Sequence, residues 1–223
     1  MVININFLCI FVLQLKKKIM KKVFLSALVI SGLALTSCSS GTTEDASLEG
    51  EKVTYTVDAE ATSLEWTGHY LVNEELHHSH TGLVKVSNGT ITMSGDKFVE
   101  GSFTIDMLSM AEPNPENAEK GQYFISHMNS DDYFNTAEFP QSTFTLKSFD
   151  ANGLSGTLSV IGINIDVDVP ATVNMTENGL TATADFSLDI AVLSLPGLQI
   201  DPENPDQRVS PKVDFKLNLV MTK

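Results

Sequence analysis

Residues 180–190 read Leu-Thr-Ala-Thr-Ala-Asp-Phe-Ser-Leu-Asp-Ile, with an apolar side chain at every even position and a polar one at every odd position up to 189. Successive side chains of a β-strand point to opposite faces of the sheet, so this stretch predicts a strand with one face in a core. The same alternation returns in residues 102–107 and 213–221. These stretches predict an all-β fold.

The alternation continues through most of the chain from Val53 onward, in short runs. The runs are separated by residues that favour turns, namely Asn88-Gly89, Ser94-Gly95-Asp96, Asn152-Gly153 and Asn178-Gly179. We therefore expect nine or ten strands in an antiparallel barrel or sandwich. Helix is expected only within residues 111–135, where a short helix could begin after Pro115.

The expected inward faces combine bulky apolar residues with small ones. The small residues are Gly82, Gly101, Gly156, Ala182 and Ala184. A solid core would fill these positions, so small side chains there predict free space inside the sheet. A barrel of about eight strands is just wide enough to hold one small ligand. An apolar barrel with space inside is a binding pocket by default.

The N-terminus has the features of a secretion signal. Lysines within residues 16–22 precede an apolar run at 23–35, which is too short to span a bilayer comfortably. Leu35-Thr36-Ser37-Cys38 resembles the bacterial lipobox, whose cysteine receives diacylglycerol. We expect a signal peptide at 1–37, lipid attachment at Cys38 and a flexible tether at 38–52.

Two alternatives concern this leader. Cleavage near Ser37 without acylation would give an ordinary secreted protein. Residues 1–19 could be an over-extended start if translation begins at Met20, and a tandem membrane anchor is the other explanation of their apolar run. With acylation, we expect a periplasmic or envelope protein anchored by its lipid, in the outer membrane.

Composition excludes several classes of function. The 223 residues include 14 basic and 28 acidic side chains, and removal of 1–37 would leave nine basic ones. Such an acidic chain, with Arg208 as its single arginine, is unsuited to nucleic acid. Cys9 and Cys38 are its cysteines, so the mature body would have no free thiol. Since no nucleophile elbow or phosphate loop occurs, we expect neither catalysis nor a cofactor.

Three histidines, His77, His78 and His80, lie close together after Glu74 and Glu75. Two imidazoles and a carboxylate could bind zinc, which would make this a metal-responsive envelope protein. The strand alternation also places His78 and His80 on the inward face, where they would make polar contacts at the mouth of a pocket. A solvated hairpin tip is the third explanation. We expect the mouth contacts and no metal.

The apolar strand faces and the irregular segment supply the candidate pocket lining. Core packing would explain these side chains equally well, in which case the barrel is fully packed and the protein structural. The functional interpretation is that they line a cavity or its lid. The candidates are Trp66, Val84, Phe103, Ile105, Met107, Phe124, Tyr133, Phe134, Phe144, Leu158 and Phe186.

Several ordered blocks resemble the YceI-like family of polyisoprenoid-binding proteins. The most specific are Gly101–Met110, which is similar to "GxFxIDMxSI", and His127–Phe144, which is similar to "HLxSxDFFxxxxYPxxTF". Tyr55–Asp58 with Leu64–Gly68, His80–Val84 and Gly156–Ile163 resemble further blocks, and the likeness runs from Val53 to Lys223.

The resemblance implies a lipocalin-like antiparallel β-barrel of about eight strands or slightly more over residues 53–223. It also implies an isoprenoid ligand of the quinone or polyprenyl phosphate type, held by the candidate lining residues for sequestration or transport. The ligand and the anchoring membrane are the expected partners, and a homodimer is compatible with this interpretation. The long segment Leu195–Pro211 is expected to reshape the mouth.

Overall fold

The computed structural model describes residues 50–113 and 118–223. The expected signal peptide (1–37), the acylated Cys38 and nearly all of the expected tether (38–52) lie outside the described residues, so these assignments stay predictions. Within the described part, no helix combines the length and the apolar character needed to cross a membrane.

The described residues form eleven strands and one α-helix, with two short 3-10 turns. The strands are β1 (Lys52–Val57), β2 (Ser63–Val72), β3 (Glu75–Ser94), β4 (Lys97–Ala111), β5 (Gln141–Asp150), β6 (Gly153–Val160), β7 (Ile163–Pro170), β8 (Thr172–Met175), β9 (Gly179–Asp189), β10 (Gln207–Val209) and β11 (Lys212–Thr222). The helix α1 spans Ala118–Met128, and the turns are η2 (Ala191–Leu193) and η3 (Pro196–Leu198).

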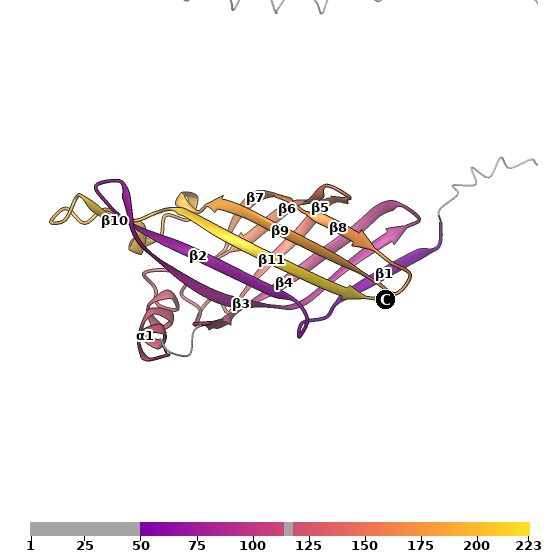
Figure 1. The fold of residues 1–223 in the computed structure, drawn as a ribbon, viewed down its shortest axis with the longest axis horizontal. Coiled ribbons are helices and arrows are strands. Elements are labelled where there is room, and N and C mark those ends of the chain that lie inside the picture. The colour runs from indigo at the N-terminus through magenta and orange to yellow at the C-terminus, as the bar shows by residue number, and fades with distance from the viewer. Residues whose placement is uncertain (1–49, 114–117) are drawn as a thin grey trace, which may run out of the picture. The chain divides into compact units, whose positions relative to one another are not determined.

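The strands make one antiparallel sheet around an apolar interior (Figure 1). β1 and β2 both lie between β3 and β11 in the sheet. Each of them pairs with a different part of β3 and of β11. From β3 the sheet continues through β4, β5, β6 and β7, and from β11 through β9 to β8. β7 contacts β9, but no ladder joins these two strands in the described part. The expected all-β, barrel-like fold with a helical insertion is confirmed.

The expected turn at Asn88-Gly89 is wrong. Both residues lie inside β3, a strand of 20 residues that joins two of the expected strands into one. The register against β4 shifts between Val86 and Asn88, so the pair marks a β-bulge. Asn88 Oδ1 accepts a hydrogen bond of 2.8 Å from the Gly89 N–H. An Asn-Gly pair serves a bulge as readily as a hairpin, and the residues alone do not distinguish the two.

The two ends of the sheet differ in packing. Figure 1 shows α1 and β10 at one end, called the mouth end, and the C-terminus at the other, called the far end. At the far end Ile91, Leu180, Leu219 and Met221 are fully buried, each no more than 2% exposed. Ala182 is also fully buried between them in the sheet, opposite Leu219. The far end is therefore a solid floor, while the mouth end is hollow.

A row of polar side chains crosses the outer face near the mouth end. Ser187 donates a hydrogen bond to Asp214 Oδ1, and His69 Nε2 lies 2.9 Å from Asp214 Oδ2. His69 Nδ1 in turn lies 2.9 Å from Ser79 Oγ. The row links β9, β11, β2 and β3 in this order. The hydrogen bonds from Ser187 and His69 lower the pKa of the Asp214 carboxyl.

This row gives a prediction for pH dependence. Because the pKa of Asp214 is lowered by folding, its contribution to stability is present above the ordinary pKa of 3.8 and is lost as the pH falls through the folded value. We expect Asp214→Asn to lower the free energy of unfolding at pH 7 by about 0.5–1 kcal/mol, a small effect because the side chain is half exposed.

Urea unfolding at pH 7 and pH 3 measures this contribution. The difference between wild type and Asp214→Asn should shrink at pH 3. Asp168→Asn, which changes an exposed carboxylate on β7, is the control and should differ little from wild type. A difference for Asp214→Asn that is equally large at both pH values would contradict the assignment.

Candidate functional site

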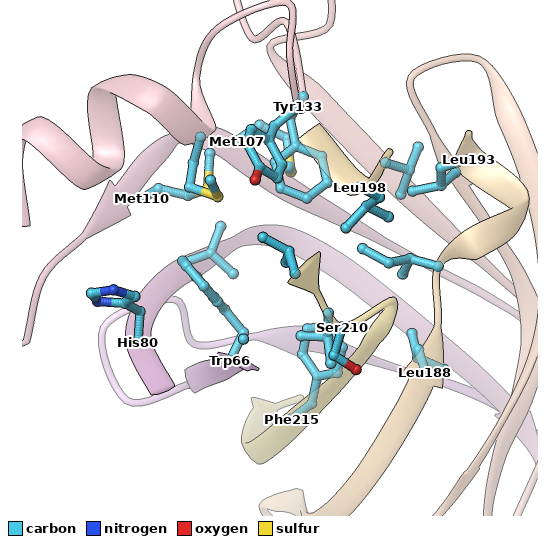
Figure 2. Close-up of a pocket in the computed structure, with 18 of the residues that line it drawn as sticks. Trp66, His80, Met107, Met110, Tyr133, Leu188, Leu193, Leu198, Ser210 and Phe215 are labelled. Atoms are coloured by element: carbon cyan, nitrogen blue, oxygen red, sulfur yellow. The ribbon is translucent and has the colours of Figure 1, made fainter. Parts of the chain in front are cut away.

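A cavity of about 330 Å³ opens at the mouth end and is called the mouth cavity. Its walls come from β2 to β7, β9 and β11, from α1 with the segment that follows it, and from the stretch between β9 and β11. Figure 2 shows Trp66 and Phe215 on one side, facing Met107 and Tyr133 on the other. The long segment after Leu195 does contribute to the mouth, as expected, through Leu198, Val209 and Ser210.

A second cavity of about 110 Å³, the inner cavity, lies between the mouth cavity and the floor. The two cavities share five wall residues, so they are adjacent parts of one hollow. The shared residues are Leu64, Ile105, Leu158, Leu188 and Phe215. A fully packed barrel is therefore not what the structure shows at this end.

All eleven candidate lining residues lie in the walls of this hollow. Those in the mouth cavity alone are Trp66, Val84, Met107, Phe124, Tyr133 and Phe134. Those in the inner cavity alone are Phe103, Phe144 and Phe186, and Ile105 and Leu158 line both. Their contact with a lipid stays a prediction.

Sequence reasoning missed part of the wall. Val213 and Phe215 follow from the alternation of residues 213–221 and could have been included. Leu193 and Leu198 come from η2 and η3, where no periodicity indicates the direction of a side chain. Their role could only emerge from the tertiary structure.

The glycines of the wall do not leave empty space, contrary to the expectation from sequence. Gly82 is paired with Trp66 across β2 and β3, and a Cβ on Gly82 would lie 2.4 Å from Cζ2 of the indole. A Cβ on Gly156 would similarly lie 2.8 Å from Cε2 of the Phe144 ring. Each glycine thus lets a large ring lie close against the neighbouring strand, so the ring occupies the wall and the centre stays open.

The helix and the segment after it close one side of the mouth cavity. Phe124 of α1 packs on Trp66, with ring centroids 5.7 Å apart. Tyr133 is buried, and its hydroxyl donates to the Gly197 carbonyl over 3.2 Å. A Cβ on Gly197 would lie 2.3 Å from the Tyr133 ring, so glycine is required for this close contact. Burial, and then the charge of Asp132, raise the pKa of Tyr133.

His78 and His80 lie at the exposed rim of the mouth cavity. The His80 ring stacks on Phe124 at 4.4 Å, and the His78 ring stacks on Tyr70 at 4.9 Å. Burial, with His80 and His77 nearby, lowers the pKa of His78 and favours the neutral imidazole. This placement agrees with polar contacts at the mouth, while the contacts themselves stay a prediction.

The metal alternative finds no support in the geometry. Nδ1 of His77 lies 2.8 Å from Nδ1 of His78, a hydrogen bond between two rings. No group of three His, Cys, Asp or Glu side chains in the described ranges is arranged to hold a metal ion.

The walls of the hollow carry no formal charge. Neither cavity is lined by Lys, Arg, Asp or Glu from the described residues, and histidines of the mouth cavity are its most polar titratable groups. Asp166, as expected, faces away from it and binds Lys147 Nζ at 2.6 Å on the outer face. Burying a charge without a partner is costly, so this hollow suits an apolar group better than a charged one.

The contact between Trp66 and Gly82 gives a prediction. A methyl group in Gly82→Ala must push the indole toward the cavity, since the added Cβ would lie 2.4 Å from it. We expect a loss of about 1–3 kcal/mol in the free energy of unfolding, as for other overpacked sites. The emission spectrum of Trp66, the single tryptophan, should change as well.

Gly68→Ala is the matched control for this variant. Its added Cβ would lie 3.7 Å from Cζ3 of the same indole, an ordinary contact. Its stability and emission should stay close to those of wild type. If the two alanine variants unfold at the same urea concentration, the proposed packing of the indole on Gly82 is wrong.

Two solved structures have a fold similar to that of this chain. A crystal structure of BcnA from Burkholderia cenocepacia is similar, with a TM-score of 0.57 and 18% identity over 74% of this chain and 98% of that one. A polyisoprenoid binding domain from Saccharophagus degradans, implicated in plant cell wall breakdown, gives a TM-score of 0.54 and 17% identity over 75% and 97%. No curated protein sequence matches the chain significantly.

The sequence itself matches the model of the YceI-like domain over residues 55–221, from β1 to β11. That range includes the strands and the helix that surround the hollow. The chain therefore belongs to the YceI-like family.

Proposed function

We propose that this protein binds the hydrocarbon chain of an isoprenoid lipid in the mouth and inner cavities, for sequestration or transport in the cell envelope. The observation that carries the proposal is the uncharged hollow itself, which is open at the mouth end and ends at a packed floor. A mouth cavity of about 330 Å³ lies within the range of about 300–1,000 Å³ for ligand pockets.

Burial of the chain alone supplies enough affinity. Each CH₂ group moved from water to an apolar site gains about 0.8 kcal/mol, so a few isoprene units bind tightly without a charged partner. The Saccharophagus degradans domain, named for polyisoprenoid binding, supports the choice of ligand by likeness of fold.

The head group of the lipid would lie at the rim. The neutral His78 ring and the His80 ring beside it offer ring nitrogens for hydrogen bonds there, next to the stacked rings of Tyr70 and Phe124. A quinone carbonyl or a polyprenyl phosphate oxygen could accept such a hydrogen bond, and both head groups are included in the proposal.

A blocking substitution tests the proposal. Leu158 lines both cavities, so the larger side chain of Leu158→Trp should close the passage between them. Asn164→Trp, at an exposed position on β7, is the matched control. Each protein is purified from its native membrane and extracted with organic solvent, and the lipid is identified by mass spectrometry.

We expect wild type and Asn164→Trp to yield an isoprenoid lipid, and Leu158→Trp to yield at least tenfold less. Circular dichroism checks that all three retain the β-fold. Extracts of folded wild type that contain no isoprenoid, before or after incubation with one, would overturn the proposal.

The lipid anchor is part of the same proposal and is tested separately. Acylation of Cys38 would anchor the protein in the outer membrane, outside the cytoplasm. We expect Cys38→Ser to move most of the protein from the membrane fraction to the soluble periplasmic fraction. Wild-type and variant protein that fractionate alike would contradict lipid anchoring at this residue.

A further inference from the structure

Exposed apolar side chains are concentrated around the mouth. Among the described residues, the large apolar side chains that are more than half exposed are Leu76, Leu108, Tyr123, Val192 and Ile200. Leu76 is at the tip of the β2–β3 hairpin, Tyr123 is on α1, and Ile200 follows η3. All of these elements lie at the mouth end. The far end exposes apolar side chains less, with Val99 at 39% and Met175 at 44%.

These exposed residues are next to residues of the cavity wall. Phe124 and Leu193 line the mouth cavity. Tyr123 directly precedes Phe124 in the sequence, and Val192 directly precedes Leu193. Exposed apolar side chains therefore lie beside the entrance of the cavity. Large exposed apolar groups gathered at one end of a protein surface mark an interaction site.

The charge around the mouth narrows the choice of partner. Glu119, Asp201 and Glu203 are exposed there and outnumber Lys120, which is exposed beside Glu119 and Tyr123. Hydrogen bonds from Asn204 and from the Glu203 backbone lower the pKa of Asp201. Arg208, the single arginine of the sequence, forms a salt bridge with Glu74. A second copy of this chain would bring the same carboxylates together, and anionic phospholipids would be repelled as well. A zwitterionic lipid surface has no net charge, so it neither repels the carboxylates nor brings further carboxylates close to them.

The described body begins at the far end. Gly50, where the described body begins, is held at the far end by a hydrogen bond of 2.7 Å from Ser94. Ser94 and His80 are 14 residues apart along β3, which corresponds to roughly 45 Å of extended strand. The N-terminal segment therefore joins the body well away from the mouth.

We propose that the mouth end docks on the surface of a zwitterionic lipid bilayer, where Leu76, Tyr123, Val192 and Ile200 enter the boundary between head groups and acyl chains. This inference rests on the proposed lipid-binding function, since docking would let an isoprenoid pass from the bilayer to the cavity without crossing water. The amount of apolar side chain inserted determines the strength of such docking.

Quenching by brominated phosphatidylcholine tests the docking. The full-length protein is bound to vesicles of this lipid with an environment-sensitive fluorophore on Tyr123→Cys or, as control, on Val99→Cys at the far end. Cys9 and Cys38 are unchanged in both, so any label on them contributes equally. We expect quenching at position 123 to be at least threefold stronger than at 99. Equal quenching at both positions would overturn the proposal.

Charged substitutions identify the docking residues. In the Tyr123→Cys protein, Leu76→Asp with Ile200→Asp should abolish most of the quenching, while Val99→Asp with Met175→Asp should leave it unchanged. All four positions are exposed, so the fold should tolerate the substitutions. Replacing part of the lipid with brominated phosphatidylglycerol should reduce quenching at low salt. Quenching that survives Leu76→Asp with Ile200→Asp, or that rises with the anionic lipid, would contradict the proposal.

The same samples separate this inference from the function on which it rests. Mass spectrometry of bound lipid reports on the cavity, and quenching reports on docking. Retained isoprenoid without quenching at position 123 rejects docking alone, whereas quenching without any isoprenoid rejects the proposed ligand. A blue shift at position 123 that depends on protein concentration in the absence of vesicles would show that a second copy covers the mouth, and would overturn the proposal.

Discussion

The close contact of aromatic rings with glycines on neighbouring strands determines whether the interior is open. Trp66 lies against Gly82, Phe144 against Gly156 and Phe103 against Gly89 in the sheet. A side chain at any of these glycines would force the ring inward, because aromatic rings are too large to share the wall with a Cβ. The rings therefore become part of a smooth wall, and the mouth and inner cavities exist because of it.

The same sheet is solid at the far end, where different residue types meet. Leu180, Leu219 and Met221 fill the space around Ala182, and none of them is more than 2% exposed. This floor stabilises the fold without any ligand, since burial of such side chains contributes about 1.5–3 kcal/mol each. Stability and binding are thus separated along the length of the strands, so the hollow end can remain unfilled while the packed end maintains the fold.

The sequence predicted the strands well because alternation reports directly on which face of a strand is buried. It predicted the side of His78, His80 and the lining candidates on strands for the same reason, whereas Phe124, Tyr133 and Phe134 were proposed as lid or wall residues from the aromatic cluster in the irregular segment. It did not predict the role of Gly82, since whether a glycine leaves space or supports a ring depends on its partner across the sheet. It also missed Leu193 and Leu198, whose direction is set by tertiary contacts, and it placed a turn at Asn88-Gly89 where β3 has a bulge.

The floor of packed side chains limits the depth of the hollow. Leu219, beneath Phe215 and Leu217 on β11, forms the bottom of the inner cavity, and Met221 below it is fully buried. Leu154 and Val169 line the same cavity from β6 and β7. Under the proposed function, an apolar chain that enters at the mouth would meet packed side chains at this depth, so the distance from the mouth to the floor would set the longest chain that the barrel encloses fully.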